Sequence, residues 1–217
     1  MQITPEVVGA LFLVFMVAAP SESDRGVIEP EIAEYIKRAQ QGDREALAIL
    51  YQLHVHAIHR YVGARIGVAE DSEDVTAEVF VAMVKALPAY RPTGAPFAAW
   101  LYRIASAQVA NYYRKHNRLT REEDVDRLQD PDSSPEELFQ DAEKLEMVRR
   151  ALNQLSEEQQ IILVMRFVER KSHAEVASSL GKSVAAVKTL QHRALIALSE
   201  LLGTSQKSRH YLRGSRE

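Results

Sequence analysis

The sequence predicts an all-α protein: two small helical domains, an N-terminal helical bundle and a C-terminal helix-turn-helix domain, joined by an acidic linker. Apolar residues recur at three- and four-residue spacing from Pro30 to His116 and again from Asp141 to Leu202. No segment shows the apolar–polar alternation that is typical of a half-buried strand. The 217 residues include only 9 Gly, 8 Pro and 7% aromatic residues, which favours helices over a turn-rich β protein.

Two helices are expected in the first part of the chain. The first begins at Pro30 and ends at Gly42, and Asp43 caps the second, whose end is marked by Gly63 and Gly67. The residues expected to face inward are Ile32, Tyr35, Ile36, Ala39, Ala46, Leu47, Leu50, Leu53, Ile58, Tyr61 and Val62.

Two further helices are expected before residue 118. Asp71 or Ser72 caps the first of these, and Pro88 stops it. A loop at 91–96 precedes the next helix, which runs from about Phe97 to His116. The expected inward residues are Val75, Val79, Met83, Val84, Leu87, Leu101, Ile104, Ala105 and Val109.

The remaining chain divides into three parts. Residues 119–140 lack a sustained apolar face and contain two prolines, so they are predicted to form a flexible acidic linker. Residues 30–118 and 141–202 then form the two domains, and the basic tail 203–217 is expected to fray. In the second domain, Ser156 and Gln159 are expected to form a capping box at the start of an apolar helix.

The formal net charge of −3 conceals a strong segregation of charge along the sequence. Residues 91–121 carry six bases and no acid, residues 122–146 carry two bases and eleven acids, and residues 147–217 carry twelve bases and six acids. The total charge argues against a protein that simply coats a polyanion, but two basic blocks on either side of an acidic one are compatible with a nucleic-acid partner. The absence of cysteine excludes disulfides, thiolate zinc sites and cysteine nucleophiles.

Residues 1–29 contain an uncharged apolar run of thirteen residues, Val7–Ala19. As a helix this run is about 20 Å long, shorter than the roughly 30 Å hydrocarbon core of a membrane, so no membrane insertion is expected. A signal peptide is disfavoured because no basic residue precedes Arg25. We expect a mis-set start or a non-essential extension.

The most specific pattern is a helix-turn-helix at 173–198. Ala177 is small enough for two helices to cross closely, Gly181 can adopt the positive φ of the turn, and Ser183 caps the second helix. Val187 and Leu190 face back towards the first helix. A plain helical hairpin needs neither the glycine nor the small, polar and basic outward face, which suits a DNA major groove and comprises Ala185, Ala186, Lys188, Thr189, His192 and Arg193.

The helix at 97–118 mixes aromatic, basic and amide side chains without a carboxylate. This mixture favours binding to single-stranded nucleic acid, because rings stack on unpaired bases and cations hold phosphates. An alternative places Phe97 and Trp100 in the core; it is favoured for Phe97 and stays open for Trp100. The residues concerned are Phe97, Trp100, Tyr102, Arg103, Gln108, Asn111, Tyr112, Tyr113, Arg114, Lys115 and Arg118.

Three motifs, in this order, resemble those of bacterial RNA polymerase sigma factors, most closely the small extracytoplasmic-function (ECF) group. They are DVTAEVF at 74–80, FAAWLYRIA at 97–105 and VKTLQHRA at 187–194. The resemblance covers residues 30–202, with sigma region 2 at 30–118 and sigma region 4 at 141–202. It implies a factor that binds core RNA polymerase, directs it to promoters and assists DNA melting.

The resemblance also implies roles for particular residues. Asp74, Glu78 and Phe80 would dock on the coiled coil of the largest polymerase subunit. The −10 element would be bound by Trp100, Arg103, Gln108, Asn111, Tyr112, Arg114, Lys115 and Arg118. The −35 element would be read by Ser183, Ala185, Ala186, Lys188, Thr189, His192 and Arg193. An anti-sigma factor, promoter DNA as duplex and melted strand, a cytoplasmic location and no cofactor or metal are also expected.

The linker fits a promoter of this kind. Twenty-two extended residues reach about 75 Å at most, and about twenty base pairs span about 70 Å, so tethered domains can occupy both elements. The acidic linker is interpreted either as an RNA mimic in a basic channel of the polymerase or as a solvated spacer.

Two other classes of function remain open. The first is a free-standing helix-turn-helix regulator with a helical sensor or dimerisation domain, which would bind duplex DNA alone on paired half-sites. The second is an interaction protein that sequesters a partner. An enzyme is not expected: of His54, His56 and His59, only the last two share a helical face, and no acid completes a metal site.

Overall fold

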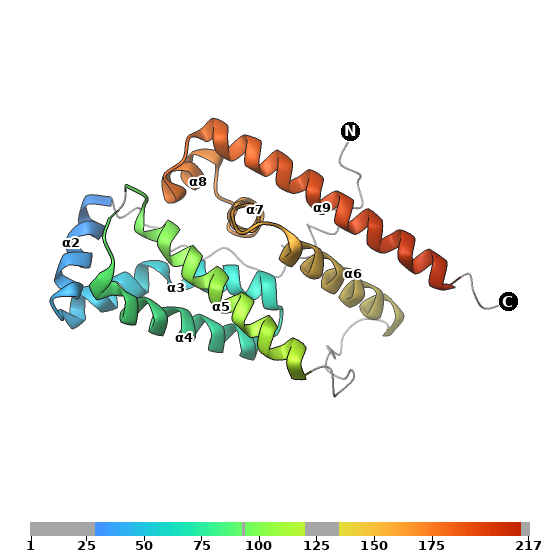
Figure 1. Cartoon of the computed structure of the whole chain (residues 1–217), viewed down its shortest axis with the longest axis horizontal. Coiled ribbons are helices and arrows are strands. Elements are labelled where there is room, and N and C mark those ends of the chain that lie inside the picture. Colours follow the sequence, from blue (N-terminus) through green and yellow to red (C-terminus); the bar gives the residue numbers. More distant parts are fainter. Residues whose placement is uncertain (1–28, 93, 120–134, 214–217) are drawn as a thin grey trace.

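The computed structural model describes residues 29–92, 94–119 and 135–213, with side chains at 31–92, 94–116 and 143–203. Every regular element in these ranges is a helix, which confirms the predicted all-α fold (Figure 1). The elements are α2 (Glu29–Gln40), α3 (Arg44–Ile66), α4 (Ala69–Ala86), η1 (Leu87–Ala89), α5 (Phe97–Leu119), α6 (Pro135–Gln154), α7 (Glu157–Leu163), the π-helical segment η2 (Val164–Val168), α8 (His173–Leu180) and α9 (Val184–Arg213).

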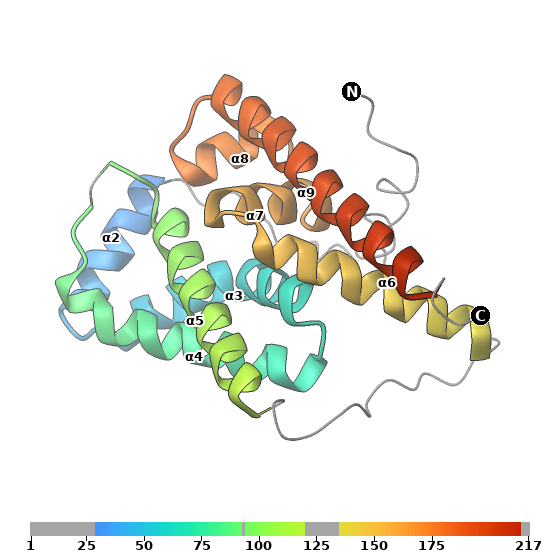
Figure 2. The same ribbon diagram turned by 45° about the vertical axis from the view of Figure 1, so that its right-hand side comes forward.

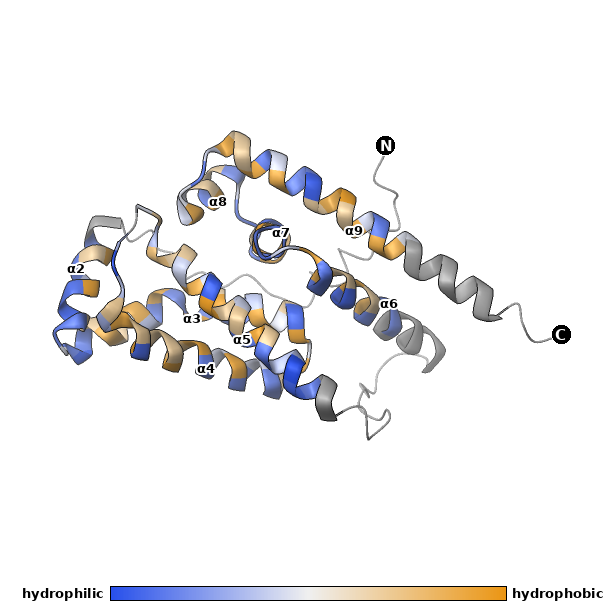
Figure 3. Cartoon of the chain, viewed as in Figure 1, coloured by the Kyte–Doolittle hydropathy of each residue, from blue (hydrophilic) through white to orange (hydrophobic). Residues whose placement is uncertain are grey.

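The N-terminal unit is a bundle of α2, α3, α4 and α5, in which α3 packs against the other three helices. Hydrophobic and hydrophilic residues alternate along these helices, as in amphipathic helices with one buried side (Figure 3). Asp43 caps α3 as predicted, and its carboxylate accepts hydrogen bonds from the backbone N–H groups of Glu45 at 2.9 Å and Ala46 at 3.2 Å. The Ala46 N–H and then the Arg38 guanidinium lower the pKa of the Asp43 carboxyl.

The expected start of α4 was wrong. The helix begins at Ala69 after Val68, and Ser72 lies buried inside its first turn, where its hydroxyl donates to the Val68 carbonyl at 2.6 Å. A hydroxyl satisfied in this way within the helix is not available as an N-cap. Val84, which was expected to face inward, is 44% exposed because it lies beside a surface groove between α3 and α4.

Two boundaries of the C-terminal unit also differ from the predictions. α6 begins at Pro135, within the segment 119–140 that was predicted to be a linker. Proline suits the first turn of a helix because its missing N–H has no partner there. α9 continues through Gly203 to Arg213, beyond the expected end at 202, so the described part of the tail is helical. Residues 120–134 and 214–217 lie outside the described residues.

The two units pack against each other, which the sequence did not indicate. α3 contacts α6 and η2, while α5 contacts α7 and α8 (Figure 2). Buried apolar residues of both units form a single core cluster. Two sets of buried polar groups join the units within this apolar contact.

The first polar set surrounds Arg65, which is only 4% exposed. Its guanidinium donates to Asn153 Oδ1 of α6 at 2.8 Å, and to Tyr61 Oη at 2.7 Å and Ser106 Oγ at 3.3 Å within the N-terminal unit. Asn153 Nδ2 in turn donates to the Arg65 carbonyl at 3.1 Å. Neutral oxygens therefore satisfy this buried cation, and Asn153 ties it to the second unit.

The second polar set joins α5 to the segment after η2. The Tyr102 hydroxyl donates to Glu169 Oε1 at 2.6 Å, and Lys171 Nζ lies 3.0 Å from Glu169 Oε2. Burial, and then the nearby Glu169 carboxylate, raise the pKa of the Tyr102 hydroxyl well above its ordinary value. Tyr102 is 2% exposed, so its ring lies in the interior and is not available at the protein surface.

Replacing Asn153 by Ala is expected to lower the free energy of unfolding by about 1–3 kcal/mol, because it removes one partner of a buried guanidinium. Urea denaturation measures the change. Gln154→Ala is the matched control, since Gln154 is exposed one residue further along the same helix. An equal effect of the two substitutions would contradict the structural role of Asn153.

Candidate polymerase and nucleic-acid interfaces

The helix-turn-helix is built by α8, a short turn and the start of α9. Ser172 and Glu175 form a capping box at α8: the Ser172 N–H donates to Glu175 Oε2 at 2.6 Å, and the Glu175 N–H donates to Ser172 Oγ at 3.2 Å. Gly181 has φ 63° and ψ 37°, the left-handed conformation predicted for the turn. Ala177 and Val187 are buried where the two helices cross, as predicted.

The outward face of α9 presents most of its predicted residues to solvent. Ser183 Oγ accepts a hydrogen bond from the Ala186 N–H at 3.1 Å, which confirms that Ser183 caps the helix. The Thr189 hydroxyl donates to the Ala185 carbonyl at 3.0 Å, so this hydroxyl is engaged within the helix. Ala186 is half-buried, and the exposed residues of the set are Ser183, Ala185, Lys188, Thr189, His192 and Arg193.

The residues of α5 that were expected to bind the −10 element fall into two groups, one exposed and one half-buried. Arg103 and Arg114 are exposed with Ala107 and Ala110 between them, a spacing that places all four on one face. Gln108, Asn111 and Tyr112 are half-buried. Lys115 is exposed, and the side chain of Arg118 lies outside the described residues.

Two predicted residues of α5 are tied to α4. The Tyr112 hydroxyl donates to Asp71 Oδ2 at 2.7 Å, and burial, followed by this hydrogen bond, raises the pKa of Tyr112. Lys115 Nζ lies 3.8 Å from Glu78 Oε1. This ion pair links a residue expected at the −10 element to one expected at the polymerase.

An aromatic cluster forms at the start of α5. The ring of Trp100 is half-buried and lies 4.5 Å from that of Tyr90 and 5.3 Å from that of Phe97, measured between centroids. Phe97 is 2% exposed, which confirms it as a core residue. Tyr102 does not belong to an exposed stacking surface, because it is buried against Glu169.

Tyr90 was not predicted from the sequence. It follows η1, next to the exposed Arg91 and before the loop at 91–96. Gln40 of α2 donates to the carbonyls of Leu87 and Tyr90, at 2.9 Å in each case, and so holds the base of this loop. The sequence feature that could have predicted its role is an aromatic residue, Tyr90, followed directly by a basic residue, Arg91, at the start of a loop.

The face expected to dock on the polymerase lies on α4. Asp74 and Glu78 are exposed one helical turn apart, and Val81, which is 52% exposed, continues the same face. Phe80, which was expected to dock on the polymerase together with these two acids, is only 6% exposed. Its ring packs edge-on against Tyr51 of α3, with the centroids 4.7 Å apart.

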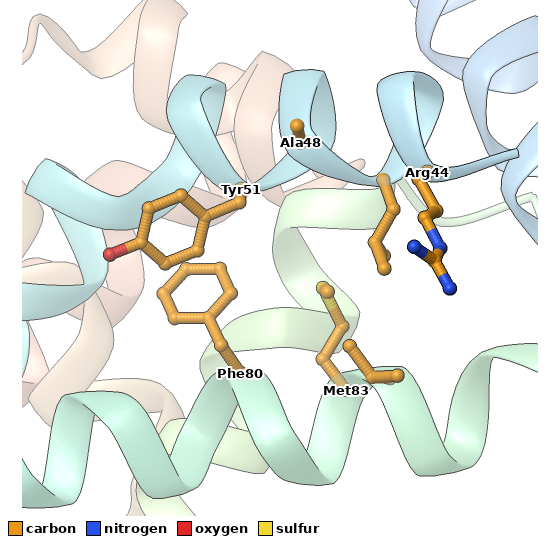
Figure 4. Close-up of a pocket in the computed structure, with 7 residues that line it drawn as sticks. Arg44, Ala48, Tyr51, Phe80 and Met83 are labelled. Carbon is orange, nitrogen blue, oxygen red and sulfur yellow. The ribbon is translucent and has the colours of Figure 1, made fainter.

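Tyr51 and Phe80 belong to an apolar groove between α3 and α4 (Figure 4). The groove has a volume of about 460 Å³, and its lining residues are Arg44, Leu47, Ala48, Tyr51, Phe80, Met83 and Val84. Tyr51 is 45% exposed at its rim. This groove was not predicted from the sequence, because the helical spacing places Val84 in the core and Tyr51 was not among the expected contacts.

The described residues offer neither a cluster of metal ligands nor a membrane-spanning helix. They contain no group of three or more His, Asp or Glu side chains placed to hold a metal ion. His59 Nδ1 lies 3.3 Å from Thr76 Oγ1 between α3 and α4, in a structural contact. None of the described helices combines the length and the apolar character that crossing a membrane requires.

Comparison with known proteins places both units in one family. The model of Sigma-70 region 2 matches residues 50–119, and the model of Sigma-70, region 4 matches residues 145–198. The chain is 33% identical over 192 residues to the ECF RNA polymerase sigma factor BldN of Streptomyces coelicolor, covering 85% of this chain and 69% of BldN.

A second relative matches over almost its whole length. The ECF RNA polymerase sigma factor SigD of Mycobacterium tuberculosis is 32% identical over 198 residues, covering 88% of this chain and 92% of SigD. Among solved structures, CnrH in complex with the cytosolic domain of CnrY shares 27% identity with a TM-score of 0.47, covering 78% of this chain and 96% of that one. The chain therefore belongs to the ECF RNA polymerase sigma factors, transcription initiation factors that direct RNA polymerase.

Proposed function

We propose that this sigma factor divides its work among three helices. The exposed face of α4 holds core RNA polymerase, α5 and its preceding loop bind the melted −10 element, and the start of α9 reads the −35 element. The protein acts in the cytoplasm by binding alone and catalyses no reaction, and an anti-sigma factor controls its access to the polymerase. The observation that carries this proposal is the exposed, acid-free face of α9 in a helix-turn-helix.

The chemistry of α9 supports a contact with duplex DNA. Residues 184–199 contain no acid, so no carboxylate on this stretch repels the phosphates. Lys188 and Arg193 are exposed on the outward side. A positive N-terminal helix end, small residues at Ala185 and Ala186, and two cations are typical of a helix that enters the major groove.

The chemistry of α5 supports a contact with single-stranded DNA. Tyr90 and Trp100 form a partly exposed pair of rings beside the loop at 91–96. Arg103 and Arg114 lie exposed further along the helix, about 16 Å apart at 1.5 Å per residue. Rings at one end and cations along the helix fit flipped bases followed by a phosphate backbone.

The proposal also requires the two units to separate on the promoter. A side chain at Gly181 would lie 2.8 Å from Pro96 Cδ, so the turn before α9 touches the loop before α5. The two promoter elements are about 70 Å apart for a spacing of about twenty base pairs. Extended, the fifteen residues 120–134 reach about 50 Å and α6 adds about 30 Å, so the chain is long enough for this separation.

Substituting Arg193 tests the proposed role of α9. For a promoter selected from random duplexes by the reconstituted holoenzyme, Arg193→Ala is expected to weaken binding about tenfold. If Arg193 contacts a phosphate, the slope of log K against log salt falls by about one as well. Fluorescence anisotropy over a salt series, with run-off transcription from the same promoter, measures both effects.

Arg150→Ala is the matched control for this experiment. Arg150 is an exposed arginine on α6 that pairs with Glu146 at 2.8 Å, outside the helix-turn-helix. We expect this variant to bind and initiate like the unmodified protein. Equal losses in the two variants would mean that charge in general, rather than the α9 face, governs promoter binding.

A further inference from the structure

We propose that the apolar run Val7–Ala19 docks in the groove between α3 and α4, and that it acts as an intramolecular inhibitor of polymerase binding. This inference rests on the proposed function, because the inhibited surface is the α4 face assigned to core polymerase. The run was expected to be a non-essential extension; here it is proposed to bind in the groove and to regulate the protein.

The groove is an apolar surface that lacks a cover among the described residues. Its floor and walls are Leu47, Ala48, Met83 and the paired rings of Tyr51 and Phe80 (Figure 4). A volume of about 460 Å³ lies within the range of about 300–1,000 Å³ that is typical of binding pockets. Tyr51 and Val84 at the groove are 45% and 44% exposed, so apolar side-chain surface at its rim is open to solvent.

The run has the composition that such a groove accepts. All thirteen residues of Val7–Ala19 are uncharged, and none is more polar than glycine. Burying the run therefore leaves no unpaired charge or polar side chain against the apolar wall. As a helix the run is about 20 Å long, enough to lie along several turns of α3 and α4.

The length of the connecting chain permits this contact. Nine residues, 20–28, separate the run from α2 and reach about 30 Å when extended. α2 has twelve residues, a length of about 18 Å, and packs against α3. α2 begins at Glu29, where residues 20–28 join it, and ends at Gln40, close in sequence to Arg44 at one end of the groove. The reach of residues 20–28 therefore exceeds the length of α2 that lies between their point of attachment and that end of the groove.

Occupation of the groove would cover part of the α4 face. Val81 and Val84 follow Glu78 on the exposed side of α4. A helix that binds over Val84 therefore extends towards Val81 and Glu78. The binding-competent state is then the fraction of molecules with an open groove. If this fraction is about one tenth, the apparent affinity for core polymerase is reduced about tenfold.

The first measurement locates the run in the full chain. A photoreactive benzoylphenylalanine replaces Phe12, and mass spectrometry maps the adducts after irradiation. The expected result is an intramolecular adduct with the peptides containing Ala48 or Val84. Adducts between two copies, adducts elsewhere, or none would overturn the proposal, as would binding to neutral phosphatidylcholine vesicles in place of the intramolecular adduct.

The second measurement is the affinity of the full chain for core polymerase. Leu11→Asp combined with Phe15→Asp places two charges in the run and is expected to strengthen binding about tenfold. Ser21→Asp with Ser23→Asp adds the same charge outside the run and is the matched control, expected to leave the affinity unchanged. Equal affinities of the run variant and the unmodified chain would overturn the inhibitory role.

The two measurements separate this inference from the proposed function. An intramolecular adduct in the groove, together with no binding of any variant to core polymerase, would overturn the proposed function and the inhibitory role but leave the docking established. Normal polymerase binding by the unmodified chain, with no groove adduct and no gain for the run variant, would overturn only the inference.

Discussion

A disulfide between cysteines at positions 95 and 181 is expected to lower promoter-specific initiation at least about tenfold, and its reduction is expected to restore initiation. The reason is that the turn before α9 and the loop before α5 are joined by the bond, whereas the two promoter elements are about 70 Å apart. Binding to core polymerase through α4 is expected to persist in both redox states, because α4 packs against α3, α5 and η1, whereas α3 and α5 make the contacts with the C-terminal unit.

The chain is well suited to this experiment. It contains no cysteine, so the introduced pair has no competing thiol. A Cβ at position 181 lies 3.5 Å from the Ala95 Cα, which is within the reach of a disulfide. Gly181→Cys costs about 1–2 kcal/mol at a positive φ. Its Cβ would also lie 2.8 Å from Pro96 Cδ, so the Pro96 ring must shift. Both costs are the same in the oxidised and reduced protein.

Run-off transcription measured before and after addition of a reductant gives the result, with Ala95→Cys alone as a control for the oxidant. Oxidised protein that initiates as well as its reduced form would show that the units need not separate at this contact. That result would also contradict the proposed assignment of α5 and α9 to distant promoter elements.

The second large effect concerns Trp100. Trp100→Leu is expected to reduce promoter opening by about tenfold or more, since stacking on a base contributes about 1–3 kcal/mol. Leucine retains apolar packing against Tyr90 and Phe97 but cannot stack on a base. Trp100→Phe retains a ring and is expected to restore most of the activity. Permanganate reactivity of unpaired thymines measures opening.

Asp74→Lys is the complementary variant, because Asp74 is exposed on the α4 face and is not part of the ion pair between Glu78 and Lys115 of α5. Reversing its charge is expected to weaken binding to core polymerase and to leave promoter opening by the assembled holoenzyme unchanged. A Trp100→Leu protein that opens promoters normally, or one that loses core binding to the same extent as Asp74→Lys, would be inconsistent with the division of roles between α5 and α4.

The features that the sequence predicted correctly depend on neighbours within one or two helical turns. The positive φ of Gly181 and the cap at Ser183 follow from local backbone requirements. The capping box at α7 was also predicted, and the Ser156 N–H donates to Gln159 Oε1 at 3.0 Å. The helical period similarly identified α2, α3 and α5.

The features that it did not predict depend on partners far along the chain. Tyr102 was grouped with nucleic-acid-facing aromatics, but its hydroxyl binds Glu169, 67 residues away. Arg65 and Asn153 are 88 residues apart and join the two units. Val84 fits an inward stripe by its spacing, yet the separation of α3 and α4 at that level leaves it at a groove. Periodicity identifies a helical face but not the element that covers it.

Run-off transcription with purified core RNA polymerase tests the sigma-factor role most directly. Core polymerase alone, and core polymerase with this protein, are compared on a duplex template that carries the promoter selected by the holoenzyme. Transcripts that start at one position only when the protein is present are the predicted result. Tight binding of the protein alone to duplex DNA, with no specific transcript when polymerase is added, would contradict it and favour a free-standing helix-turn-helix regulator.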